Sequence, residues 1–193
     1  MPLNKINPKE FLTSYLDDFS NLVKPDKDIV HKLVEVTDLL KDVHADGKKA
    51  LIFGNGGSAA ISSHFSVDLT KNAGIRCVNC NESDLITCFS NDYGYERWVE
   101  KAVDFYGDEG DLLIVISSSG SSKNMLNGVK AARNGNFNAV VTCTGFADEN
   151  PLRQLGDINL WADSKAYNFI ENIHQVWLLA IVDLIIGSRE YSA

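Results

Sequence analysis

Two amphipathic helices are predicted at the start of the chain. From Pro8 to Val23 the apolar residues recur every three or four positions, which is the spacing of one helix face. Pro25 interrupts this pattern, and a second run with the same spacing extends from Ile29 to a stop around Gly47. The two runs predict a pair of antiparallel helices within residues 1–47.

After residue 47 the pattern changes to short apolar runs separated by small-residue loops and helical spacers. Such runs are typical of parallel strands buried on both faces. The predicted strands are 49–53, 75–79, 111–117, 139–144 and 158–161. Five strands with intervening helices predict a flavodoxin-like, doubly wound parallel α/β sheet over residues 48–193. The whole chain, 1–193, has the length of one domain.

Two further helical regions complete the predicted fold. Residues 83–106 form a long helical stretch that is interrupted at Asn91-Asp92-Tyr93-Gly94. The last helix, Tyr167–Ile186, is so apolar that we expect it to be covered on nearly all sides, in the core and at an oligomer interface.

Composition narrows the class of protein. Hydrophobic residues make up 45% of the 193 positions, which is enough for a core, and the net charge is −8. This sign argues against direct binding to nucleic acid or to an anionic membrane surface. The N-terminus lacks a basic start followed by an apolar run, and no stretch reaches the roughly 18 apolar residues of a membrane span. We therefore expect a soluble, cytoplasmic protein.

The four cysteines are expected to be reduced, buried thiols. Cys77, Cys80, Cys88 and Cys143 lie mostly in apolar, strand-like surroundings. Cys77 and Cys80 form a C-x-x-C, but no second pair accompanies them, so a metal or redox role is disfavoured.

Two loops carry the candidate chemistry. The first predicted strand leads into Gly54-Asn55-Gly56-Gly57-Ser58, and the third leads into Ser117-Ser118-Ser119-Gly120-Ser121-Ser122. Backbone N–H groups at a helix start, together with several hydroxyls, suit a phosphate dianion without a basic residue. If the strand order reverses between these strands, both loops line one crevice. Neither loop has the G-x-G-x-x-G or Walker spacing, so no nucleotide cofactor is expected.

The same segments resemble a known family. The two loops, together with His64-Phe65 and Asn91-Asp92-Tyr93-Gly94-Tyr95-Glu96, resemble the sugar isomerase (SIS) domain and, within it, the phosphoheptose isomerases. The resemblance implies conversion of sedoheptulose 7-phosphate to an aldose heptose 7-phosphate by a cytoplasmic homotetramer with sites between subunits, often with zinc. It also implies that a phosphorylated sugar contacts Asn55, Ser58, Ser117, Ser118, Ser119 and Ser122, with Asp92 on a sugar hydroxyl. Gly56 and Gly57, between Asn55 and Ser58, are included in the predicted binding loop.

Acidic and histidine side chains supply the candidate acid–base and metal-binding groups. His64 and Asp68 lie four residues apart, and Glu171 and His174 lie three apart, so each pair shares a helix face. The four could form a metal-binding cluster if the two helices approach, within one subunit or across an interface. For aldose–ketose isomerisation we predict Asp68 and Glu171 as the proton-transfer groups.

The resemblance also identifies departures. Aligned on His64, the usual catalytic glutamate falls at Asp68, which is shorter by one methylene; Glu171 replaces a glutamine, and Leu179 replaces a second histidine. The leading hypothesis is an isomerase of phosphoheptose isomerase type. The alternatives are a phosphosugar-binding sensor or protein-interaction scaffold without catalysis, favoured by Leu179, and an isomerase of another sugar phosphate.

Overall fold

Five parallel strands form the centre of the computed structural model, which describes residues 6–191. The strands are β1 (Ala50–Gly54), β2 (Cys77–Val78), β3 (Leu112–Ser117), β4 (Ala139–Thr144) and β5 (Ile158–Trp161). Their order in the sheet is β2-β1-β3-β4-β5, and every neighbouring pair is parallel. This confirms the predicted flavodoxin-like sheet, with β1 at the point where the direction of winding reverses.

Seven α-helices and two short 3₁₀ helices connect and cover the strands of the described chain. They are α1 (Pro8–Leu22), α2 (Lys27–Ala45), α3 (Gly57–Lys71), α4 (Ser83–Tyr93), η1 (Tyr95–Arg97), α5 (Trp98–Tyr106), α6 (Lys123–Asn134), η2 (Arg153–Leu155) and α7 (Tyr167–Ile186). The predicted interruption of the 83–106 stretch is confirmed at Gly94, whose φ of +90° does not continue a helix, whereas Asn91, Asp92 and Tyr93 still belong to α4.

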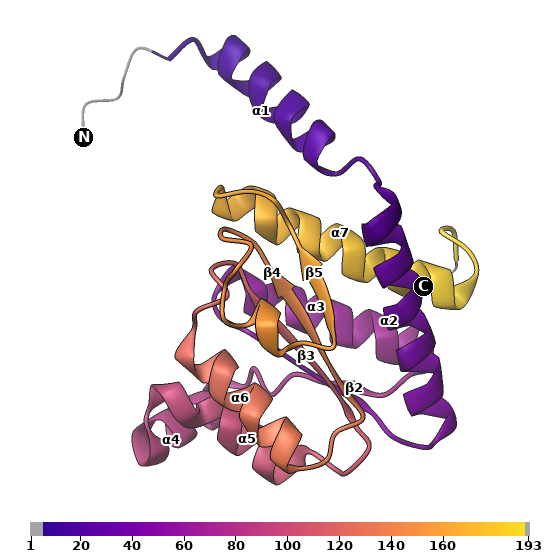
Figure 1. The fold of residues 1–193 in the computed structure, drawn as a ribbon, viewed down its shortest axis with the longest axis vertical. Coiled ribbons are helices and arrows are strands. Elements are labelled where there is room, and N and C mark those ends of the chain that lie inside the picture. Colours follow the sequence, from indigo (N-terminus) through magenta and orange to yellow (C-terminus); the bar gives the residue numbers. More distant parts are fainter. Residues whose placement is uncertain (1–5, 192–193) are drawn as a thin grey trace.

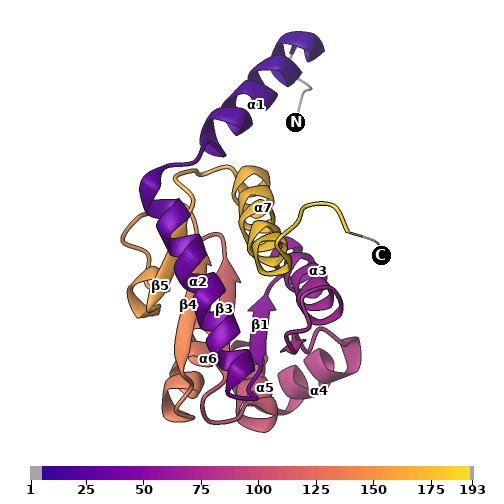
Figure 2. The same ribbon diagram turned by 90° about the vertical axis from the view of Figure 1, so that its right-hand side faces the viewer.

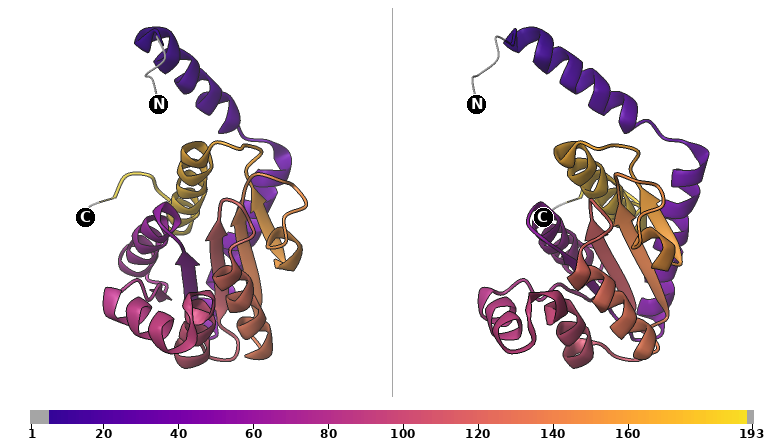
Figure 3. Two further views of the ribbon diagram at one scale, coloured as in Figure 1. Left: turned by 90° about the vertical axis from the view of Figure 1, so that its left-hand side faces the viewer. Right: turned by 60° about the vertical axis from the view of Figure 1, so that its left-hand side comes forward.

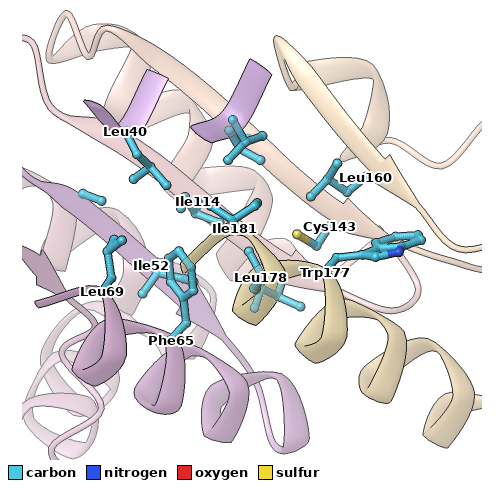
Figure 4. Close-up of a cluster of buried hydrophobic side chains, with 14 of the residues drawn as sticks. Leu40, Ile52, Phe65, Leu69, Ile114, Cys143, Leu160, Trp177, Leu178 and Ile181 are labelled. Carbon is cyan, nitrogen blue, oxygen red and sulfur yellow. The ribbon is translucent and has the colours of Figure 1, made fainter. Parts of the chain in front are cut away.

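The helices form one layer on each face of the sheet. Helices α2, α3 and α7 cover one face (Figure 2), where residues such as Ile52, Phe65 and Leu178 form one buried cluster (Figure 4). Helices α4, α5 and α6 cover the other face (Figure 3), where Phe53 and Trp98 belong to a second cluster. Because successive strand residues point to opposite faces, Ile52 and Phe53 enter different clusters. Because helices cover both faces of the sheet, the central strands have almost entirely apolar sequences.

The first helix does not pair with the second, so the predicted antiparallel helix pair is wrong. Helix α1 projects away from the body, whereas α2 lies along the sheet (Figure 1). No residue of α1 is buried, and its inner side contacts α7 through Tyr15 and Phe19, whose rings lie 4.6 and 5.6 Å from that of Phe169. The amphipathic pattern identified a helix correctly, but it carried no information on the partner of the apolar face.

The last helix is only partly covered by its own chain. Helix α7 has the predicted bounds, and its buried side packs on α2 and α3. Val176 and Leu184 are 44% and 49% exposed, so one chain leaves part of α7 uncovered, at the side where the prediction requires an oligomer interface. An 18-residue window of α7 has a mean hydropathy of 1.6, enough by length and composition to cross a membrane, which corrects the expectation that no such stretch exists. Core helices of globular proteins pass the same test.

The cysteines agree with the prediction except at one position. All four are free, and Cys80 and Cys143 are buried, whereas Cys77 is half-buried and Cys88 is exposed. Burial raises the pKa of Cys80 to about 11 and that of Cys143 to about 12, so both thiols stay protonated and unreactive at neutral pH. Cys88 was wrongly expected to be buried.

Candidate functional site

The two loops singled out in the sequence meet at one edge of the sheet. Strands β1 and β3 are neighbours, with Gly54 opposite Ile116, so the loops that follow them leave the sheet side by side. Between them lies a cavity of about 160 Å³. Its lining residues are Asn55, Ser58, Ile116, Ser117, Ser118, Ser119, Ser122, Tyr167 and Glu171. Six of the predicted phosphosugar contacts and the predicted carboxylate Glu171 are therefore brought together.

The first loop turns tightly into α3. Gly56 has a φ of +55°, which favours glycine, and α3 begins at the next residue without a side-chain cap. A Cβ on Gly54 would collide with the backbone of Ser58, because the helix start folds back onto the end of β1. The uncapped N-terminus of α3 thus faces the cavity with the positive end of its dipole.

The second loop is held by its own hydroxyls and backbone. Ser117 Oγ donates to Ser122 Oγ over 3.2 Å, and Ser119 Oγ accepts from the backbone N–H of Ser121 over 3.3 Å. Gly120, at a φ of +64°, donates its N–H to the carbonyl of Ser117 over 2.9 Å. Helix α6 then starts at Lys123, again without a side-chain cap. Hydroxyl donors and a second free helix start make this loop suited to a phosphate.

Glu171 enters the cavity from α7. Its carboxylate lies against Gly57 at the start of α3, so close that any side chain at Gly57 would collide with it. The carboxylate accepts no hydrogen bond from the described residues. The cavity therefore joins a set of hydrogen-bond donors to one acceptor of negative charge, and this acceptor is available to a ligand hydroxyl or to a proton.

Tyr167 is a lining residue that the sequence analysis missed. It lies one helical turn before Glu171, and its ring packs edge-on against Phe146 with centroids 4.9 Å apart. The i, i+4 relation to Glu171 was the signal that could have identified it, because residues four apart share a helix face. Ile116, at the end of β3, supplies the apolar floor and was likewise not predicted as a site residue.

Asp92 does not line the cavity. Its carboxylate is exposed, accepts from Asn91 Nδ2 over 2.8 Å and lies 3.7 Å from Cys88 Sγ. The segment that carries Asp92 reaches the site through Tyr95, whose hydroxyl donates to Asn55 Oδ1 over 3.0 Å. The predicted contact of Asp92 with a sugar hydroxyl is not formed by the cavity of one chain.

Asp68 also lies outside the cavity. It is ten residues beyond Ser58 on α3, about 15 Å along the helix at 1.5 Å per residue. Its carboxylate pairs with His64 Nε2 over 3.2 Å and accepts from Asn72 Nδ2 over 3.3 Å. The predicted catalytic pair, Asp68 and Glu171, is therefore separated within one chain.

The predicted four-residue metal cluster does not form within the described chain. His64 and Asp68 pair with each other, and His64 Nδ1 lies 3.0 Å from Gln175 Nε2. His174 is fully buried and donates from Nε2 to the carbonyl of Thr144 over 3.0 Å, away from Glu171. Among residues 6–191 no three His, Cys, Asp or Glu side chains converge on one point. The residues of one chain thus do not fit the zinc ion that the resemblance implied.

His174 is a neutral core residue in this structure. Burial lowers its pKa to about 4, and the hydrogen bond to Thr144 opposes this effect only in part. Its Nδ1 atom finds no partner among the described residues. The spacing of Glu171 and His174 placed both on neighbouring positions of α7, but one faces the cavity and the other faces the core.

The chain is similar to known proteins in both sequence and structure. Residues 14–145 match the family model of the SIS domain. The chain is 30% identical over 180 residues to a phosphoheptose isomerase of Fusobacterium nucleatum, covering 89% of this chain and 91% of the relative. It is 32% identical over 180 residues to one of Salmonella paratyphi B, covering 90% and 92%.

Solved structures with the same fold carry the same description. A phosphoheptose isomerase from Neisseria gonorrhoeae superimposes with a TM-score of 0.86 at 27% identity, covering 93% of this chain and 99% of the other. One from Francisella tularensis gives a TM-score of 0.87 at 23% identity, covering 95% and 100%, which supports the fold alone.

Proposed function

The chain belongs to the SIS-domain family, and from this membership we propose that it is a phosphoheptose isomerase, which interconverts sedoheptulose 7-phosphate and the aldose heptose 7-phosphate. One observation carries the proposal. The hydroxyl-rich loop after β3, the glycine-rich loop after β1 and the carboxylate of Glu171 line the same cavity at the switch point of the sheet.

The loop of residues 117–122 after β3, here called the serine loop, binds the phosphate. Ser117, Ser118, Ser119 and Ser122 supply hydroxyls, and the uncapped start of α6 adds N–H groups and the positive end of a helix dipole. A dianion can be held in this way by a protein with a net charge of −8, since the donors are local and uncharged.

The first loop binds the sugar. Asn55 and Ser58 present polar side chains at the cavity wall, and the backbone at Gly56 can approach a sugar closely because the space beside its Cα is open. Donors at the N-terminus of α3 stabilise the negative charge that develops on the carbonyl oxygen during reaction.

Glu171 moves the proton. In the ketose, a base removes a proton from C1 while the C2 carbonyl oxygen takes up a proton, which gives an ene-diol. The C1 hydroxyl then loses its proton as the base returns its proton to C2, which gives the aldose. Glu171 is the acceptor that faces the cavity with its lone pairs free of bonds from the described residues, so it is suited to this transfer. The sugar hydroxyls supply the hydrogen bonds that its carboxylate otherwise lacks.

Asp68 acts in the site of a second copy. The cavity of one chain, at about 160 Å³, is smaller than the roughly 300–1,000 Å³ of most small-molecule sites. A cytoplasmic homotetramer with sites between subunits would supply the missing wall, and with it Asp68 and Asp92. Support comes from the apolar residues that one chain leaves exposed, which include Leu12 and Leu16 on α1 and Val176 and Leu184 on α7.

The first experiment is an isomerase assay on sedoheptulose 7-phosphate, with and without added zinc, beside a binding titration of the same sugar. Turnover is expected to be lost in Asp68→Asn, because this change removes the second proton-transfer carboxylate and keeps the size of the side chain. Sedimentation of the same sample determines the oligomer. Comparing turnover with and without added zinc tests whether a zinc ion takes part in the reaction.

The opposite result would favour the alternative function. Tight binding of the sugar phosphate with no turnover would overturn the isomerase and indicate a sensor or scaffold, for which Leu179 in place of the family's second histidine is the sequence observation. Turnover of another sugar phosphate only would keep the reaction and change the substrate.

A further inference from the structure

The side chain of Asn55 is held by two residues that do not line the cavity. Asn55 and Asn124 form a reciprocal amide pair, with Asn55 Nδ2 donating to Asn124 Oδ1 over 3.1 Å and Asn124 Nδ2 donating to Asn55 Oδ1 over 2.8 Å. The hydroxyl of Tyr95 donates to the same Asn55 Oδ1 over 3.0 Å. Three hydrogen bonds therefore hold one amide group.

These bonds determine what Asn55 can offer a ligand. A side-chain amide has two acceptor sites on oxygen and two hydrogens on nitrogen. Both acceptor sites of Asn55 are occupied by Asn124 and Tyr95, and one hydrogen is given to Asn124. One N–H remains, so Asn55 acts in the cavity as a donor to a ligand oxygen.

The two partners come from different parts of the fold. Asn124 is in the first turn of α6, two residues after Ser122 of the serine loop, and Tyr95 begins η1. Asn124 is only 2% exposed, so its amide cannot itself reach a ligand, and an unpaired amide there would be costly. The amide pair therefore joins α6, which begins directly after the serine loop, to the loop after β1, which contacts the sugar.

We propose that Asn124 and Tyr95 are positioning residues, which orient the Asn55 amide so that its free N–H faces the sugar of a bound sugar phosphate. The assignment rests on the proposed function, because it takes the ligand of this cavity to be a sugar phosphate. Asn124 contributes more than Tyr95, since it makes two of the three bonds and is buried.

The test uses two variants, each of which removes a hydrogen-bond donor to Asn55 Oδ1. Asn124→Asp keeps an acceptor for Asn55 Nδ2 but places a second oxygen and a negative charge opposite Asn55 Oδ1, and Tyr95→Phe removes one hydroxyl. We expect KM for the sugar phosphate to rise about tenfold in Asn124→Asp and about threefold in Tyr95→Phe, as expected for lost hydrogen bonds of ordinary strength. We expect kcat to change less than threefold, because Asn55 holds the ligand and transfers no proton.

Residues close to Asn124 and Tyr95 in the chain provide matched controls. Asn127 Nδ2 donates to the carbonyl of Glu96 over 2.9 Å, so it also joins α6 to η1 but does not touch Asn55. Tyr93 lies two residues before Tyr95 and makes no side-chain hydrogen bond among the described residues. Asn127→Asp and Tyr93→Phe are therefore expected to leave KM unchanged within twofold.

Two further measurements separate positioning from a general loss of structure. Inorganic phosphate, which probes the serine loop alone, is expected to bind Tyr95→Phe as it binds the wild-type protein, because this variant adds no charge. In an Asn55→Ala background, Tyr95→Phe is expected to cause no further rise in KM, because Tyr95 acts through Asn55.

Each contrary outcome has a defined meaning. If Asn124→Asp and Asn127→Asp raise KM equally, or if the effect of Tyr95→Phe persists in Asn55→Ala, the positioning role is overturned while the proposed function stands. If the wild-type protein binds inorganic phosphate but no sugar phosphate, the proposed function fails, and the positioning role fails with it.

Discussion

The carboxylate of Glu171 lies against the Cα of Gly57, where α7 crosses the start of α3. Gly57 is the first residue of α3 and its φ lies outside the left-handed region, so its own backbone would accept an alanine. The absence of a side chain at this position is thus required by Glu171 and not by the turn. The two residues form one unit of the cavity wall.

Gly57→Ala is expected to destabilise the protein by about 1–3 kcal/mol, because its Cβ would overlap the carboxylate of Glu171 in a packed wall. Combined with Glu171→Ala, the same substitution should become neutral or stabilising, since alanine is preferred over glycine within helices. Urea unfolding of the wild-type protein, both single variants and the double variant measures this coupling. Equal effects of Gly57→Ala in both backgrounds would show that the two residues do not touch.

Glu171→Gln is expected to lower kcat by roughly 100-fold or more while KM changes little, because the variant keeps size and polarity but cannot accept a proton. Steady-state assays on sedoheptulose 7-phosphate measure both constants. Asp183→Asn is the matched control, since it neutralises another carboxylate of α7 that does not line the cavity. Unchanged turnover in Glu171→Gln would exclude Glu171 as the base.

Gly120→Ala is expected to disrupt the serine loop. The φ of +64° costs a residue with a Cβ about 1–2 kcal/mol, and this Cβ would also collide with the buried side chain of Asn150. Gly74→Ala is the control, because Gly74 has a similar φ of +73° with open space around it. The affinity for inorganic phosphate should fall in Gly120→Ala only, and a similar loss in Gly74→Ala would contradict the assignment of the loop.

Stability should fall as the solution is acidified, because His174 is buried in its neutral form. Its pKa is about 4 in the folded protein, against about 6.5 in an unfolded chain, so the unfolded state binds more protons between these values. The stability lost through this group begins as pH falls through 6.5 and reaches about 2 kcal/mol by pH 5. In His174→Gln, which cannot titrate, urea unfolding at pH 7.5 and 5.0 should show a correspondingly smaller loss. An equal loss in both proteins would assign the effect to other groups.

Much of the fold could be predicted from local pattern. The five strands and the break before Tyr95 follow from apolar runs and from glycine, and these signals do not depend on distant contacts. β2 is shorter than predicted, and at its start Ile75 is still tied to α3, because its N–H donates to the carbonyl of Leu69. The outward course of α1 could not be predicted, since amphipathicity indicates an apolar face but not what covers it.

The candidate site divides in the same way. The chain itself determined the two loops, because glycine and serine at strand ends have local conformational reasons, and parallel strands bring their carboxyl ends to one edge. It did not determine which face of α7 each side chain takes. Glu171 and His174 are three residues apart on the same helix. Tertiary packing alone places Glu171 at the cavity and His174 against the carbonyl of Thr144. The positions of Asp68 and Asp92 were also decided by tertiary packing. Residues on one face of a helix meet those of a second helix only where the two helices touch. Helix α3 touches α7 where Gly57 meets Glu171 and where His64 meets Gln175.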